Sequence, residues 1–228
     1  MTPRELFRNN PFVLVFVSLM LFLVLSTAMN TFFLGLLFSL TLLTGIYATF
    51  EGKPKLNFGL VVGVVAIVMT FSISLETKDV FQNVIRFIFF FSFVGYVCHR
   101  IMMKVIRSKD IDFNIISGAV SVYLLIALEF SFVFSLLHYF DEQSFRFPTD
   151  YENALDLVYF SYVTITTLGY GEITPVNPIA RSLSIVLALV GQLYLTILVA
   201  ILVSKFKGWK MLQREDPSQD EEESPPQG

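Results

Sequence analysis

The sequence is poor in the residue types that build metal, redox and hydrolytic sites. Cys98 is its only cysteine, so neither a disulfide framework nor a thiolate metal site is expected. His99 and His138 are the only histidines, which argues against zinc chemistry. No cluster of histidines with carboxylates, nucleophile motif or phosphate-binding loop occurs along the chain. The sequence therefore favours neither an enzyme nor a protein that carries a cofactor.

Charged residues are also scarce, and long stretches of the chain lack them altogether. Hydrophobic residues make up 54% of the 228 positions, which is too apolar for a soluble domain of this length. A transmembrane helix needs about 20 predominantly apolar residues. Six stretches qualify: 11–29, 31–50, 58–75, 80–103, 115–140 and 179–206. A seventh apolar stretch, 155–165, is too short to span the membrane and fits a re-entrant helix. We expect an all-α integral membrane protein with six transmembrane helices and a re-entrant helix between helices five and six.

The lysines and arginines predict the orientation of these spans, because positively charged loops stay on the cytoplasmic side. With both termini cytoplasmic, twelve basic residues lie inside and four elsewhere. The inner twelve are Arg4, Arg8, Lys53, Lys55, Arg100, Lys104, Arg107, Lys109, Lys205, Lys207, Lys210 and Arg214. We therefore expect a multi-pass protein of the plasma or inner cell membrane, with its N- and C-termini in the cytoplasm and membrane lipids as partners.

A glycine-bearing motif lies between the last two predicted spans. Residues 164–171 read Thr-Ile-Thr-Thr-Leu-Gly-Tyr-Gly. Glycine takes left-handed backbone angles without a Cβ clash, so Gly169 and Gly171 allow the backbone to turn successive carbonyl oxygens toward one axis. A lone Gly-Tyr-Gly is common in ordinary turns. Here the Thr-Thr pair, a hydrophobic residue, the glycines and Glu172 follow one another inside a membrane hairpin, which makes the motif much more specific.

Residues 159–175 resemble the pore loop of the tetrameric potassium channel family, from pore helix through selectivity filter to outer mouth. The resemblance implies backbone carbonyls that replace the hydration shell of K⁺ at Thr167, Leu168, Gly169 and Tyr170. It also implies that the Thr167 hydroxyl closes the innermost K⁺ site and that Gly171 completes the ion-binding loop. K⁺ is then the permeant ion, and no cofactor is implied.

The surroundings of this filter agree with the family in part. By the resemblance, support for the filter comes from Thr164, Thr166, Tyr159 and Glu172, the last standing where the family more often has Asp. Tyr159 and Phe160 match a pair of tryptophans whose ring nitrogens brace the filter tyrosine, and Phe160 has no donor to offer. Val163 replaces a glutamate that some members place behind the filter. These departures put filter stability and slow inactivation in question more than selectivity.

The last predicted span carries the features expected of a gate. Gly191 interrupts its helical pattern where the family has its gating-hinge glycine, although close helix packing is an alternative role for this residue. Gln192, Thr196, Val199 and Val203 share one helical face, and by the resemblance that face lines the cavity. Gln192 and Thr196 would keep water below the filter, whereas Val199 and Val203 could form an apolar constriction that gates by dewetting.

The first four predicted spans lack the charges of a voltage sensor. From Arg86, every third position of the fourth span is uncharged until Lys104 and Arg107, and segments 11–50 and 58–75 contain no charged residue. One charge crossing 100 mV supplies only about 2.3 kcal/mol, so steep voltage gating is not expected. Glu129 lies within the fifth span, and an intramembrane carboxylate is a functional candidate. We favour a structural, hydrogen-bonded role for it.

The chain divides into a four-helix bundle over 1–110, a pore domain over 111–212 and a disordered acidic tail over 213–228. Because one chain contributes one filter strand, a homotetramer with cyclic symmetry is implied. The resemblance is closest to small prokaryotic six-span members, strongly over 112–206 and only in architecture over 1–110. Nucleic acid and soluble partners are not implied. The predicted function is passive, potassium-selective conduction without strong voltage gating; a weakly selective cation channel and a component of a potassium uptake transporter are the alternatives.

Overall fold

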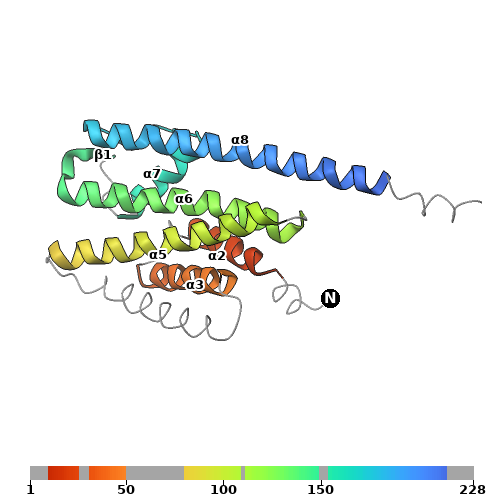
Figure 1. Ribbon diagram of the computed structural model, residues 1–228. Coiled ribbons are helices and arrows are strands. Elements are labelled where there is room, and N and C mark those ends of the chain that lie inside the picture. Colours follow the sequence, from red (N-terminus) through yellow and green to blue (C-terminus); the bar gives the residue numbers. More distant parts are fainter. Residues whose placement is uncertain (1–9, 26–30, 50–79, 109–110, 149–153, 215–228) are drawn as a thin grey trace, which may run out of the picture.

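The computed structural model describes residues 10–25, 31–49, 80–108, 111–148 and 154–214, which form helices for most of their length. The helices are α2 (Pro11–Leu25), α3 (Thr31–Thr49), α5 (Val80–Arg107), α6 (Phe113–Phe140), α7 (Ala154–Ile165) and α8 (Pro178–Arg214). A 3-10 turn, η1 (Glu142–Ser144), and two short strands, β1 (Phe145–Arg146) and β2 (Thr174–Pro175), complete them. In Figure 1, α6 lies between α8 on one side and α2 and α5 on the other, and α7 packs between α6 and α8.

Three of these helices are long and apolar enough to cross a membrane: Val80–Arg107, Phe113–Phe140 and Pro178–Ser204. They correspond to the fourth, fifth and sixth predicted spans. Shorter apolar helices cover part of the first two, and the third predicted span, 58–75, lies outside the described residues. Also outside them are the basic residues Arg4 and Arg8 and the acidic tail beyond Arg214. Helix α8 continues to Arg214, and so into the segment predicted as tail.

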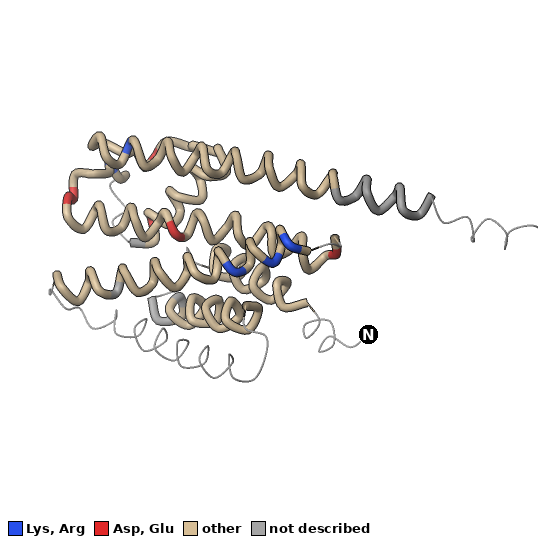
Figure 2. The backbone as a smooth tube through the Cα atoms, viewed as in Figure 1, with Lys and Arg blue, Asp and Glu red and all other residues tan. Residues whose placement is uncertain are grey.

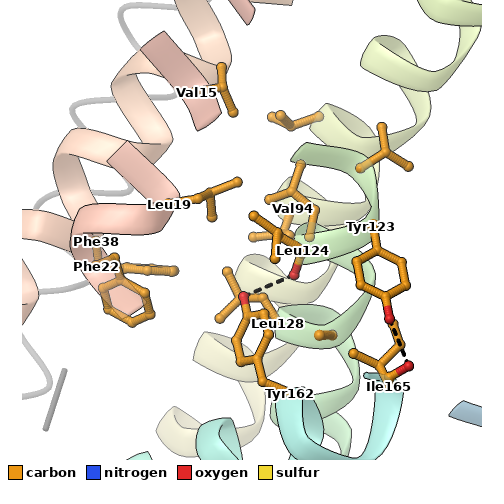
Figure 3. Close-up of a cluster of buried hydrophobic side chains, with 14 of the residues drawn as sticks. Val15, Leu19, Phe22, Phe38, Val94, Tyr123, Leu124, Leu128, Tyr162 and Ile165 are labelled. Carbon is orange, nitrogen blue, oxygen red and sulfur yellow. Dashed lines mark hydrogen bonds between the residues drawn. The ribbon is translucent and has the colours of Figure 1, made fainter. Parts of the chain in front are cut away.

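The core of the bundle is a continuous set of apolar side chains contributed by α2, α3, α5 and α6. Leu19 of α2, Val94 of α5 and Leu128 of α6 are almost completely buried in it (Figure 3). Helices α2 and α6 approach closely at Gly118, where a Cβ would lie 2.8 Å from the Phe12 ring. Membrane helices commonly use such small residues to bring backbones together. Helices α2 and α5 therefore pack against α6, and α3 packs against α2 and α5.

Basic residues near the C-terminal end of α5 are engaged with neighbouring helices. The Nζ atom of Lys104 donates to the Ala48 carbonyl at 2.9 Å and lies 5.6 Å from the centre of the Phe12 ring. Arg100 donates to the Thr49 carbonyl at 3.4 Å. Cations there satisfy the free carbonyls at the C-terminus of α3 and complement its dipole. Figure 2 shows these charges gathered at the end of the bundle where α2 begins.

A polar network ties the end of α6 to the start of α8. The strands pair antiparallel, Phe145 opposite Pro175, and the amide of Val176 donates to the Ser144 carbonyl at 2.8 Å. Asn177 caps α8 by accepting from the Ala180 amide at 2.7 Å, and its side-chain amide donates to Asp141 at 2.7 Å and to Ser144. The connection after α6 therefore fixes the position at which α8 begins.

Candidate functional site

The loop that follows α7, residues 166–171, has left-handed backbone at every second position. The φ angles are 62° at Thr167, 54° at Gly169 and 89° at Gly171, and no other described residue has a positive φ. Left-handed angles at the two glycines agree with the sequence-based expectation. Thr167 is different, since a positive φ is a genuine outlier for a β-branched residue and costs on the order of 1–3 kcal/mol. Such strain persists only where the surroundings hold it, which marks Thr167 as a candidate functional position.

Hydrogen bonds to α7 orient the peptide groups of this loop. The carbonyl of Val163 accepts from the amide of Leu168 at 3.1 Å and from that of Gly169 at 3.3 Å. In a planar trans peptide the carbonyl points opposite to the amide hydrogen of the next residue. The carbonyls of Thr167 and Leu168 therefore point away from α7. The loop presents oxygen atoms on its free side, and it is exposed throughout residues 166–171.

Every one of the last four carbonyls of α7 has a hydrogen-bond partner, as the end of a buried helix requires. Tyr162 accepts from the Thr166 amide, Val163 from two amides and Thr164 from the Thr167 amide. Each of these donors lies in the loop itself. The fourth carbonyl, that of Ile165, accepts instead from the hydroxyl of Tyr123 on α6 at 2.7 Å (Figure 3).

Of the residues predicted to support the loop, two take part in hydrogen bonds at its base and two lie near the ends of the region. The Thr166 hydroxyl donates to the Tyr162 carbonyl at 2.6 Å, and Thr164 contributes its backbone carbonyl. Tyr159 and Glu172 are half-buried near the two ends of the region. Val163 cannot replace a glutamate side chain, but its carbonyl is the acceptor that anchors the loop. The sequence did not indicate this role, because it belongs to the backbone.

Phe160 packs against aromatic rings of α6 and β1. Its ring lies 5.3 Å from the rings of both Phe134 and Phe145, edge to face, and only 7% of the residue is exposed. Such aromatic pairs contribute about 0.5–1.5 kcal/mol beyond the area they bury. Phe160 therefore stabilises the contact between α7 and α6 and offers no hydrogen bond to Tyr170, as its chemistry predicts.

Three tyrosines that no sequence motif marks as site residues anchor these helices. Besides Tyr123, Tyr162 of α7 donates to the Leu124 carbonyl at 2.9 Å, and Tyr194 of α8 donates to the Ala119 carbonyl at 2.6 Å. A buried tyrosine hydroxyl needs a partner, so a tyrosine within an apolar span is a signal for such a bond. The signal gives no information on which carbonyl accepts.

Gly191 lies where α8 passes the end of α7. A Cβ at this position would lie 2.5 Å from Cγ1 of Ile165 and 2.9 Å from its carbonyl oxygen. Helix α8 is continuous through Gly191. Close packing, one of the two roles considered for this glycine, thus has a direct structural cause, and the hinge role stays a prediction.

The predicted cavity face of α8 is exposed in the single chain. Val199 and Val203 are 58% and 49% exposed, and Gln192 and Thr196 are exposed as well. The Thr196 hydroxyl donates to the Gln192 carbonyl at 2.8 Å. Leu168 and Tyr170 in the loop are similarly exposed, at 58% and 68%. The loop and α8 therefore both expose apolar side chains in the single chain.

Two carboxylates belong to α6 and to its C-terminal cap, Glu129 and Asp141. Hydrogen bonds from the Asn177 side chain first, and from Ser144 and the Gln143 amide, lower the pKa of Asp141 below its ordinary value against a smaller effect of desolvation. Glu129 of α6 faces Gly95 of α5, and its Oε2 atom is buried with no hydrogen-bond partner among the described residues. The hydrogen-bonded role expected for Glu129 is thus not seen at this oxygen.

Two comparisons with known proteins bear on this region. A family model described as "Ion channel" matches residues 121–207, which run from α6 through the loop into α8. The protein "Two pore potassium channel c" of Oryza sativa subsp. japonica is 45% identical over 49 residues, which are 22% of this chain and 11% of that protein. No solved structure matches the chain. The match to the family model supports an ion channel domain over residues 121–207, which is not a class of enzyme.

Proposed function

We propose that the protein is a potassium-selective channel that conducts K⁺ passively through a homotetrameric pore. The observation that carries the proposal is the alternation of φ along residues 166–171, with the amides of Leu168 and Gly169 bonded to Val163. This backbone leaves carbonyl oxygens free on one side. A ring of such oxygens can replace the hydration shell of an alkali cation.

K⁺ would bind between successive rings of oxygens from Thr167, Leu168, Gly169 and Tyr170. Gly171 would complete the outermost ring, and the Thr167 hydroxyl would close the innermost site. The strain at Thr167 supports this assignment, because a residue without the hydroxyl, such as glycine, would adopt the same φ of 62° freely. Exposure of residues 166–171 in one chain leaves them free to face a central axis.

Four copies are needed because one chain supplies one loop, and cyclic symmetry places identical loops around an axis. The uncovered surface of the loop and α8, which includes Leu168, Tyr170 and Val199, supports such an assembly. We propose six spans in the plasma or inner cell membrane with cytoplasmic termini. The basic residues at the C-terminal end of α5 agree with that orientation (Figure 2).

The pore is not expected to depend strongly on voltage. In α5, Arg100 and Lys104 donate to carbonyls at the end of α3, so moving them across the membrane would break these contacts. Opening is assigned to α8, with Gly191 as the hinge and with Val199 and Val203 as the apolar constriction. A weakly selective cation channel is the second candidate, because Phe160 gives Tyr170 no hydrogen bond.

The test is ion flux through the full-length protein reconstituted in liposomes. The flux of K⁺ is compared with that of Na⁺, and a protonophore lets protons compensate the charge that the ions carry. Potassium flux far above sodium flux supports the proposal, and equal fluxes support the weakly selective channel. Gly169→Ala should lower conduction, because alanine at a φ of 54° costs about 1–2 kcal/mol even though no atom lies within 4 Å of the added Cβ. Gly95→Ala is the matched control, since its new methyl meets only the end of the Glu129 side chain. Absence of K⁺ flux from a folded wild type would refute the proposal.

A further inference from the structure

The carbonyl of Ile165 is the point where α6, α7 and α8 meet. It is the last carbonyl of α7, and Ile165 is only 1% exposed. In a continuing helix its partner would be the amide of Gly169, but that amide bonds Val163 instead. The Tyr123 hydroxyl takes its place from α6, while the bare backbone of Gly191 on α8 packs against the same carbonyl.

Tyr123 is in turn held by α8. The rings of Tyr123 and Tyr194 are stacked, with centroids 6.0 Å apart and planes inclined by 27°. The Tyr194 hydroxyl donates at 2.6 Å to the carbonyl of Ala119, one turn before Tyr123 on α6. A displacement of α8 at this level must therefore disturb the ring that carries the donor to Ile165.

We propose that Tyr123 and Tyr194 are positioning residues that link α8 to the base of the 166–171 loop. Tyr123 fixes the carbonyl at which the loop begins, and Tyr194 makes that bond depend on the place of α8. This inference rests on the proposed channel function, in which α8 opens the pore and the loop selects the ion. Movement of α8 is then transmitted to the oxygens of the loop through two aromatic rings.

The variants Tyr123→Phe and Tyr194→Phe test the link, and Tyr162→Phe is the matched control. Tyr162 also donates a buried hydroxyl between α7 and α6, to the Leu124 carbonyl next to Tyr123, but that bond lies one turn away from the loop. All three changes remove one oxygen and keep the ring. A purely structural role predicts similar effects for the three, whereas a positioning role predicts effects on the loop from two of them.

The first measurement is hydrogen exchange of a peptide covering residues 163–171 in the purified full-length protein, which needs no conduction. Tyr123→Phe should speed exchange of the Leu168 and Gly169 amides about tenfold, equivalent to about 1.4 kcal/mol, because the Ile165 carbonyl loses its donor. Tyr194→Phe should act in the same direction and more weakly. The double variant should not exceed Tyr123→Phe, since both act through one bond, and Tyr162→Phe should stay within about twofold of wild type.

The second measurement is the ratio of K⁺ to Na⁺ permeability of the same variants, which should fall for Tyr123→Phe and Tyr194→Phe and not for Tyr162→Phe. If Tyr123→Phe does not fold, Tyr194→Phe against Tyr162→Phe carries the comparison alone. The link is overturned if the 163–171 peptide exchanges at the same rate in all three variants, or if no variant exchanges faster than wild type. A wild type without K⁺ selectivity overturns the proposed function instead, and the exchange measurement still decides the link.

Discussion

Thr167 combines a strained backbone with a hydroxyl group at the entrance to the loop. Glycine would relieve the strain at a φ of 62°, and it would remove the oxygen that the proposed innermost ion site uses. We therefore expect Thr167→Gly to keep or raise the melting temperature of the protein while lowering the ratio of K⁺ to Na⁺ flux. Opposite changes in stability and function are typical of strained functional positions.

Thr167→Ser is the control for this pair of measurements, because serine retains the oxygen and lacks only the branching methyl. It should keep most of the selectivity. A lower melting temperature in Thr167→Gly would mean that the positive φ at this position is not strained. Unchanged selectivity would mean that the Thr167 hydroxyl is not part of the ion site.

Gly191 is the second residue whose replacement should be costly. An added methyl would overlap Cγ1 and the carbonyl oxygen of Ile165, and one of the two is backbone that cannot turn aside. We expect Gly191→Ala to lower the free energy of unfolding by about 1–3 kcal/mol, the usual range for overpacking, in a denaturation experiment. The control is Gly95→Ala, where the flexible Glu129 side chain can move. Unchanged stability with altered opening would favour the hinge role over packing.

At the scale of elements, the Asp141–Asn177 network should make stability depend on pH. Because the folded-state pKa of Asp141 is lowered, its ionised form stabilises the fold at every pH above the unfolded pKa. That contribution is lost as pH falls through the folded pKa, so the window lies below about pH 4, the ordinary range for aspartate. The melting temperature should fall between pH 7 and pH 2, and it should fall less in Asp141→Asn.

Asn177→Ala should reduce the same acid dependence and also lower stability at neutral pH, because the cap of α8 is lost at a cost of about 0.5–2 kcal/mol. Glu142→Gln, which removes the charge of the exposed neighbouring carboxylate, is the control variant. An identical profile in Asp141→Asn would show that this network does not link protonation to folding.

The long elements could be predicted from the sequence because burial and membrane insertion both follow apolar runs. Helices α5, α6, α7 and α8 lie where those runs predict them, and the left-handed glycines follow from their missing Cβ. The pairing of β1 with β2 was not predicted, since strands of two residues carry no periodic pattern. The end of α8 was missed because its last residues are polar but still form good helix.

The anchoring contacts of the candidate site were harder to predict for a different reason. The bonds of Tyr123 and Tyr194 join positions 42 and 75 residues apart to specific backbone carbonyls. Which carbonyl accepts depends on how far each helix is shifted along its neighbour, and apolar composition alone leaves this shift free. The buried position of Phe160 likewise depends on the rings of Phe134 and Phe145 that pack against it.

At the scale of the whole molecule, the single 166–171 loop of each chain predicts association of the chain with itself, because a closed ring of oxygens needs several loops. Ile185, Leu189 and Leu193, together with Val199, are all more than half exposed. We expect the purified full-length protein to have the mass of four chains in native mass spectrometry from detergent. A dimer or a monomer that still conducts K⁺ would contradict the homotetramer, because fewer than four loops cannot close a ring of this kind.

The Val163 carbonyl, which accepts hydrogen bonds from two amides of the loop, also affects whether the loop can bind anions. A chloride ion in contact with this loop would need hydrogen-bond donors, and the hydrogens of Leu168 and Gly169 are already committed to the protein interior. What faces outward at Thr167 and Leu168 is the negative end of each peptide dipole. At Thr167 and Leu168, halides should therefore be disfavoured by the backbone itself, without the help of an acidic side chain.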